Sequence, residues 1–158
     1  MTDRSATFGS FTIHRTYAAS PARVFAAWGD AEAKNAWFGS DSDKYDVQTR
    51  EFNFHIGGRD RLVGLWKSGM TTDFSSCYHD IVPNERIVYD YEMALNGVRI
   101  SVSLATIEIK PHGTGSRLTL TEQAVFLDGF DDGGGRERGT TELVGMMEAA
   151  LDLHPLSE

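Results

Sequence analysis

One carboxylate, Glu122, lies in an otherwise apolar pattern in the last predicted strand, 116–126. In the two-residue alternation of a strand, Glu122 shares a face with Leu118, Leu120, Ala124 and Phe126. A carboxylate on an inward face must find a hydrogen-bond donor or keep its proton. Glu122 is therefore a candidate polar anchor for a ligand, or a candidate acid–base group. A β-bulge that turns it outward is an equally open alternative.

Basic side chains elsewhere in the chain are the candidate partners of an inward Glu122. Arg61 and His55 are the two candidates. Arg59, Arg61 and Lys67 share one parity along their strand, which favours a solvated outer face for all three.

Aromatic side chains are abundant in the predicted strands and helices. Tyr89 and Tyr91 share the apolar face of their strand with Ile87 and Met93, and tyrosine hydroxyls on such a face need partners. Methionines on the last helix suit an adaptable apolar pocket. These residues either line a cavity or fill the core. The candidate ligand-binding residues are Trp28, Trp37, Phe38, Phe54, Trp66, Tyr78, Tyr89, Tyr91, Glu122, Leu143, Met146 and Met147.

Familiar catalytic and metal-binding patterns are missing from the sequence. Cys77 lies within a predicted strand, which favours a buried structural thiol over a nucleophile. There is no Gly-x-Ser-x-Gly elbow, and no glycine pair is followed by the Lys-Ser/Thr of a phosphate loop. The five histidines lack the spacing of a zinc motif. We therefore predict no metal and no cofactor, and we assign no catalytic residue.

The predicted elements begin with one strand, continue with two short helices and a run of strands, and end with one helix. Ser20 and Pro21 are typical of the cap and first residue of a helix, and Asn96-Gly97 is a strong hairpin signal. The predicted strands are 11–17, 46–54, 59–67, 72–82, 87–93, 98–110 and 116–126, with helices at about 21–28, 31–37 and from 136 onward. Residues 128–135, rich in glycine and aspartate, are predicted to form a loop.

The last helix has an apolar stripe at helical spacing. Its members are Leu143, Met146, Met147, Ala150 and Leu151, and Glu142 and Glu148 are predicted to lie off it. The order of elements predicts an α+β fold, with a curved antiparallel sheet of about seven strands around the C-terminal helix. A cavity between sheet and helix is expected from this geometry.

Several segments together carry a family resemblance over about residues 11–153. They are Arg15–Trp28, Ala36–Phe38, Phe52–Gly58, Tyr78–Tyr89 and Arg117–Thr121. The chain resembles the activator of heat-shock protein 90 ATPase homologue (Aha-like) family of the SRPBCC, START-like (Bet v-like) superfamily. The resemblance implies a helix-grip fold. One departure is Gly139-Thr140, where many members have Gly-Trp, and the missing indole would enlarge the cavity or change what fills it.

Composition limits the class of partner and the compartment. The chain has 158 residues, with 15 Lys+Arg against 23 Asp+Glu, and a net charge of −8. This acidity argues against nucleic-acid binding. We find no secretory signal and no membrane-spanning stretch, and the single cysteine excludes an intrachain disulfide. We expect a cytoplasmic protein with a single domain over residues 1–158.

The leading functional expectation is the binding of a small apolar or amphipathic molecule between the sheet and the last helix. Two alternatives remain open at this point. One is an enzyme of the cyclase or hydrolase type that uses an inward carboxylate. The other is a chaperone-binding module like the co-chaperone domain for which the resembled family is named. A homodimer is compatible with all three.

Overall fold

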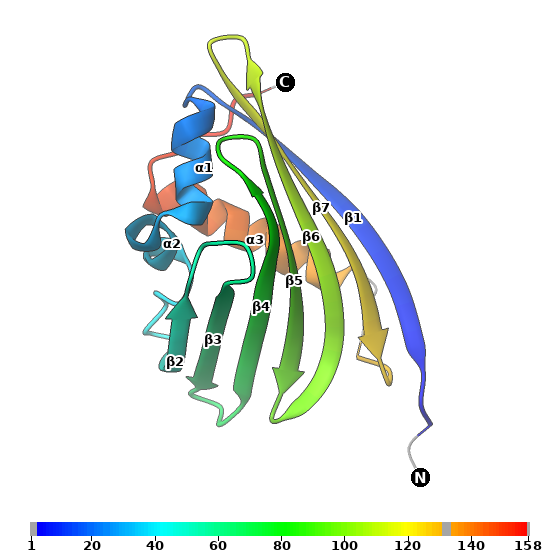
Figure 1. Ribbon diagram of the computed structural model, residues 1–158. Helices are drawn as coiled ribbons and strands as arrows, with labels where there is room; N and C mark the ends of the chain where they lie inside the picture. The colour runs from blue at the N-terminus through cyan, green and yellow to red at the C-terminus, as the bar shows by residue number, and fades with distance from the viewer. Residues whose placement is uncertain (1–2, 131–133, 158) are drawn as a thin grey trace.

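The computed structural model describes residues 3–130 and 134–157. Seven strands form one antiparallel sheet in the order β1-β7-β6-β5-β4-β3-β2. The strands are β1 (Ala6–Tyr17), β2 (Tyr45–Phe52), β3 (Arg59–Trp66), β4 (Thr71–Val82), β5 (Arg86–Leu95), β6 (Val98–His112) and β7 (Gly115–Leu127). The helices are α1 (Pro21–Gly29), α2 (Ala31–Trp37) and α3 (Gly135–Ala150). The predicted helix-grip arrangement is confirmed (Figure 1).

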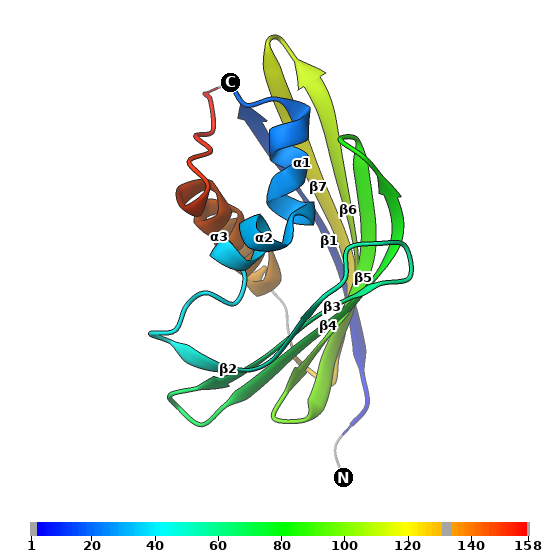
Figure 2. The same cartoon turned by 60° about the vertical axis from the view of Figure 1, so that its left-hand side comes forward.

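The sheet is strongly curved, and all three helices lie on its concave side. Figure 2 shows α1 near one end of the sheet, with α3 crossing the concave face and α2 beside it. Twist between neighbouring strands curves a sheet of this size, so its concave face needs a covering layer. None of the helices in the described residues is long and apolar enough to cross a membrane.

Local signals in the sequence explain where the helices and hairpins begin. The Ser20 side chain accepts a hydrogen bond from the backbone N–H of Arg23, and Pro21 is the first residue of α1, as predicted. The β5–β6 hairpin turns at Asn96 and Gly97, which have φ angles of 50° and 80°. This left-handed pair produces the backbone twist that a two-residue hairpin requires.

Several predicted boundaries differ from the structure. β2 ends at Phe52, so Phe54 lies in the loop that leads to β3. Within this loop Gly58 is tightly enclosed, because an added Cβ would lie 2.0 Å from the carbonyl oxygen of Asn53. Pro111 and His112, predicted to lie in a turn, belong to β6. Of the predicted loop 128–135, residues 131–133 lie outside the described residues.

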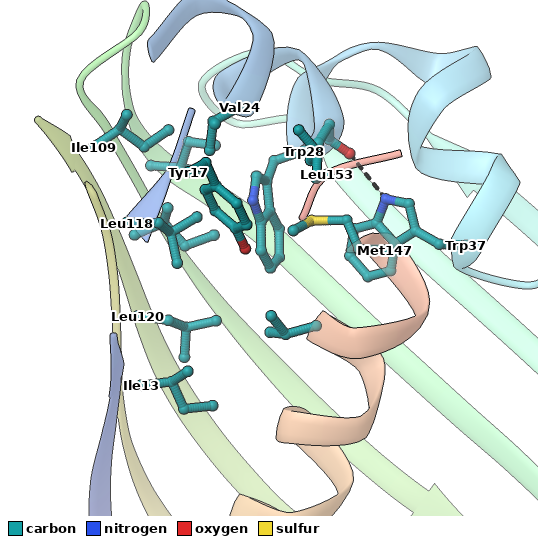
Figure 3. Packing of buried hydrophobic residues seen from close by; sticks show 14 of the residues in the cluster. Ile13, Tyr17, Val24, Trp28, Trp37, Ile109, Leu118, Leu120, Met147 and Leu153 are labelled. Carbon is teal, nitrogen blue, oxygen red and sulfur yellow. Dashed lines mark hydrogen bonds between the residues drawn. The ribbon is translucent and has the colours of Figure 1, made fainter. Parts of the chain in front are cut away.

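The main hydrophobic core lies where α1 and the end of α3 meet the sheet. Figure 3 shows Tyr17, Val24 and Leu118 packed with Trp28 and Met147. The two tryptophans of this region, Trp28 and Trp37, meet edge to face with ring centroids 5.0 Å apart.

The buried face of α3 differs from the predicted stripe. Val144 and Met147 are buried, but Ala150 is exposed. Glu148 was predicted to lie off the stripe, and this was wrong: it is 8% exposed. Its Oε2 atom accepts a hydrogen bond from the Tyr17 hydroxyl at 2.7 Å and pairs with Nε of Arg15 at 3.2 Å. The end of α3 is therefore fastened to β1 by polar contacts, which apolar periodicity cannot reveal.

Candidate ligand pocket

A pocket of about 360 Å³ lies between the concave face of the sheet and the N-terminal half of α3. Its volume falls within the range of small-molecule sites. Strands β3, β4, β5 and β7 form one wall, and α2 with the segment that follows it forms another. The lining residues are mostly aromatic or aliphatic, and the charged residues among them are Lys34, Asp41, Lys44, Glu122, Arg136 and Glu142.

Most of the candidate residues named from the sequence line this pocket. They are Trp28, Trp37, Phe38, Trp66, Tyr89, Tyr91, Glu122, Leu143 and Met146. Three others do not line it. Met147 is fully buried in the core, and Tyr78 and Phe54 pack against each other with ring centroids 5.0 Å apart. Nine of the twelve candidates therefore lie together at one pocket, and the other three belong to the adjacent core.

Glu122 faces the pocket and is 2% exposed. The bulge alternative is wrong, because β7 stays in register with both neighbours here, pairing Glu122 with Phe11 and with Ala105. Its Oε1 atom accepts a hydrogen bond from the Tyr91 hydroxyl at 2.8 Å. Its Oε2 atom is buried without a hydrogen-bond partner among the described residues.

The pKa of the Glu122 carboxyl is raised by its burial. The hydrogen bond from Tyr91 and the positive charge of Arg136 oppose this rise without cancelling it. The neutral acid is therefore favoured over a wider pH range than for an exposed glutamate.

Arg136, in the first turn of α3, is the basic residue that accompanies Glu122. Its guanidinium donates to the Tyr91 hydroxyl at 3.1 Å and to the hydroxyls of Ser103 and Ser101 at 3.2 and 2.7 Å. The same group lies over the rings of Tyr91 and Phe126, 5.4 and 5.3 Å from their centroids. These contacts hold the beginning of α3 against β5 and β6.

The partners predicted for Glu122 lie elsewhere. Arg61 pairs with Asp73 at 3.0 Å on the outer side of the sheet, and His55 is exposed in the β2–β3 loop. Arg136 was missed because it follows a glycine-rich loop whose path the sequence does not define. The predicted outer face of Arg59, Arg61 and Lys67 agrees with their exposure.

Tyr89 lies beside Glu122 on the pocket wall. Burial, followed by the negative charge of Glu122, raises the pKa of the Tyr89 phenol well above its usual value. Its hydroxyl makes no hydrogen bond with the described residues, whereas that of Tyr91 is fully engaged. Tyr89 and the free oxygen of Glu122 thus present two polar groups with unused hydrogen-bonding capacity. The Glu122 oxygen accepts a hydrogen bond when the carboxyl is ionised and donates one when it is protonated.

A second polar cluster lies where α2 meets β2 and β3. Lys34 is 5% exposed and Asp60 is 1% exposed, and the Lys34 amine is 3.4 Å from Oδ2 of Asp60. Asp60 also binds the Arg50 guanidinium through Oδ1 and accepts a hydrogen bond from the Tyr78 hydroxyl at 3.1 Å. Burial lowers the pKa of the Lys34 amine, while the charge of Asp60 opposes that change. Nothing in the sequence distinguishes Lys34 from a solvated helix residue.

A chain of aromatic ring contacts connects the two polar groups of the pocket. Phe38 meets Phe74 with centroids 5.0 Å apart, and Phe74 meets Tyr91 at 4.9 Å. The pocket therefore has an aromatic middle, with the Lys34 amine on one side and the Glu122 carboxyl on the other. Among the described residues, no group of three or more His, Cys, Asp or Glu side chains could hold a metal ion. The arrangement suits an apolar molecule that carries a few polar atoms.

Comparison with known proteins agrees with this architecture. Residues 18–152 match the family described as "Activator of Hsp90 ATPase homolog 1-like protein". No curated protein matches the chain.

Several solved structures are similar over most of their length. A putative uncharacterized protein from Rhizobium leguminosarum is 38% identical, with a TM-score of 0.86, over 96% of this chain and 99% of that one. The Mll3558 protein from Rhizobium loti is 39% identical, with a TM-score of 0.84, over 92% and 99% of the two chains. The AHSA1 protein from Silicibacter pomeroyi is 18% identical, with a TM-score of 0.71, over 91% and 98%, and shows the same fold.

Proposed function

This chain belongs to the family of activator of Hsp90 ATPase homolog 1-like proteins, and we propose that it binds a small apolar or amphipathic molecule in the pocket beneath α3. The observation that carries the proposal is the Oε2 atom of Glu122, a buried acceptor without a partner on the wall of an aromatic pocket. A buried polar atom left unpaired costs about 1–3 kcal/mol. A ligand hydroxyl would recover that cost, because it can donate to the ionised carboxylate and accept from the neutral acid.

The apolar part of the ligand would supply most of the affinity. Each Å² of apolar surface removed from water contributes roughly 25 cal/mol before the costs of association. Tyr89 and Glu122 would then select the ligand by its polar atoms. We place this activity in the cytoplasm and involve no nucleic acid, in keeping with the net charge of −8.

Thr140 provides a sharp test, because it lines the pocket on α3. Thr140→Trp would fill the pocket, and the adjacent Thr141→Trp is the matched control, since Thr141 is exposed and outside the pocket. Titration with 2-naphthalenemethanol, an apolar molecule with one hydroxyl, should show binding to the parent and to Thr141→Trp. Thr140→Trp should bind at least about tenfold more weakly, which corresponds to about 1.4 kcal/mol.

Native mass spectrometry of the protein from its own cells gives an independent readout. We expect a small-molecule adduct that disappears on denaturation. Equal affinity of Thr140→Trp and the parent for the probe, together with a clean unliganded mass, would overturn the proposal.

A second candidate function, acid–base catalysis on the bound molecule, is favoured by one observation: the raised pKa of a pocket carboxyl, Glu122. Incubating the molecule recovered from the native protein with fresh protein distinguishes the two functions. Chemical change by the parent but not by Glu122→Gln would indicate an enzyme. An unchanged molecule would indicate a binding protein.

A further inference from the structure

The Lys34 amine lies in a box of aromatic rings at the pocket wall. Its Nζ is 4.7 Å from the ring centroid of Trp37, 5.0 Å from that of Phe38 and 5.4 Å from that of Trp28. Lys34 is only 5% exposed, yet it belongs to the lining of the pocket. A molecule in the pocket would therefore meet an amine that bulk water scarcely reaches.

The charges around Lys34 do not balance. The Arg50 guanidinium contacts the Asp60 carboxylate, and the two opposite charges form a neutral pair. The other oxygen of Asp60 also accepts a hydrogen bond from Tyr78. Among the described residues, Asp60 is the one carboxylate paired with Lys34, so a protonated Lys34 would be the second cation on a single anion.

A surplus charge at a buried site is costly, and the free amine avoids that cost. The faces of the surrounding rings offset a part of it through cation–π attraction. Burial nevertheless lowers the pKa of Lys34 from its usual value. Desolvation of this kind favours the free amine, which is the form that attacks carbonyl groups.

We propose that Lys34 captures an apolar aldehyde or ketone in the pocket as an imine. This inference rests on the proposed binding function and names the chemical class of its ligand. The lone pair of Nζ attacks the carbonyl carbon, and the carbonyl oxygen takes a proton from nitrogen to give a carbinolamine. The oxygen then leaves as water with the second proton of the nitrogen, and a C=N bond forms. One amine and one carbonyl compound thus yield one imine and one water, without an oxidant or reductant.

The structure supports this step in two further ways. The aromatic middle of the pocket would hold the body of the ligand, and its position beside Nζ would replace a chance encounter with a local one. Because Arg50 and Tyr78 already engage both oxygens of Asp60, the loss of charge on Lys34 leaves that carboxylate paired.

Reductive trapping with 2-naphthaldehyde and sodium cyanoborohydride tests the proposal at neutral pH. The imine is reduced to a secondary amine, and the protein gains the mass of the aldehyde less one oxygen atom. Peptide mapping should place the label on Lys34, ahead of the exposed Lys44, Lys67 and Lys110. A lowered pKa enlarges the fraction of free amine, so we expect Lys34 to be labelled faster than these three exposed lysines.

Matched variants separate this proposal from the pocket itself. Lys34→Met should abolish the preferred label and leave the Arg50–Asp60 pair in place, whereas Lys110→Met, at an exposed position outside the pocket, should not change it. Circular dichroism and the binding of 2-naphthalenemethanol would show that Lys34→Met is folded. If the alcohol binds to the parent but the aldehyde labels all lysines alike, the Lys34 proposal fails and the pocket proposal stands. If the alcohol does not bind either, both fail.

Discussion

Asp60→Asn is expected to destabilise the protein far more than any exposed charge removal. The substitution keeps the size of a side chain that is 1% exposed but deletes the charge that the Arg50 guanidinium faces. Removing one partner of a buried ion pair costs about 3–5 kcal/mol, because the other charge stays buried without compensation. The nearby Lys34 adds no relief, since it can only contribute further positive charge.

Asp73→Asn is the matched control for this change. Asp73 also pairs with an arginine of β3, Arg61, at 3.0 Å, but both side chains are about one third exposed. Exposed pairs of this kind contribute about 0–1 kcal/mol. The two substitutions thus remove the same charge from two adjacent strands, β3 and β4, at positions that differ in burial.

Urea unfolding gives the free energies directly, and thermal unfolding gives a second readout. For a chain of this size each kcal/mol corresponds to about 2–4 °C, so Asp60→Asn should lower the Tm by about 6–20 °C. The double variant Asp60→Asn/Arg50→Met removes both partners of the pair and should be more stable than the single variant. A loss for Asp60→Asn within about 1 kcal/mol of that for Asp73→Asn would refute the reasoning that burial makes this cluster costly to break.

Two further predictions concern other buried polar contacts. Tyr17→Phe deletes the hydroxyl that donates to Glu148 at 2.7 Å. A hydrogen bond to a charged group contributes about 1.5–3 kcal/mol, so urea unfolding should show a loss of this size in the free energy of unfolding. An unchanged free energy would mean that the contact does not hold α3 against β1. For Glu122, whose pKa is raised by burial from 4.5, the folded state binds more protons than the unfolded state as the pH rises above 4.5. The stability of the parent should therefore fall with increasing pH relative to Glu122→Gln, and parallel profiles of unfolding free energy against pH would contradict the shift.

The inward direction of Glu122 could be predicted from the sequence. Side chains of a strand alternate between the two faces of a sheet as long as no bulge shifts the pairing register. β7 pairs without a shift with both β1 and β6, so the face assigned from Leu118 and Leu120 holds as far as Phe126. The same reasoning correctly placed Tyr91 on the inner face of β5. Periodicity is reliable in these central strands because one face is covered by helices along their length.

The polar partners could not be predicted in this way. Arg136 meets Tyr91 across 45 positions of the sequence, and Lys34 meets Asp60 only because α2 folds back over β3. Pairwise contacts of this kind depend on loop paths and helix rotation, on which hydrophobic periodicity carries no information. The rotation of α3 shows the same limit, since Val144 rather than Ala150 turned out to be buried.

The two halves of α3 lie in different surroundings: one half packs in the core and the other borders the pocket. Its C-terminal half places Met147 in the core and ties Glu148 to β1. Its N-terminal half presents small residues to the pocket: Gly139, where an added Cβ would meet nothing within 4 Å, and Thr140. Close packing is the rule in protein interiors, so space left beside the middle of a covering helix needs a reason. Arg136 supplies the support that packing would otherwise give, because its hydrogen bonds to β5 and β6 hold the beginning of α3 over the open space. The helix is thus anchored to the sheet at both ends, and the pocket lies between the two anchors.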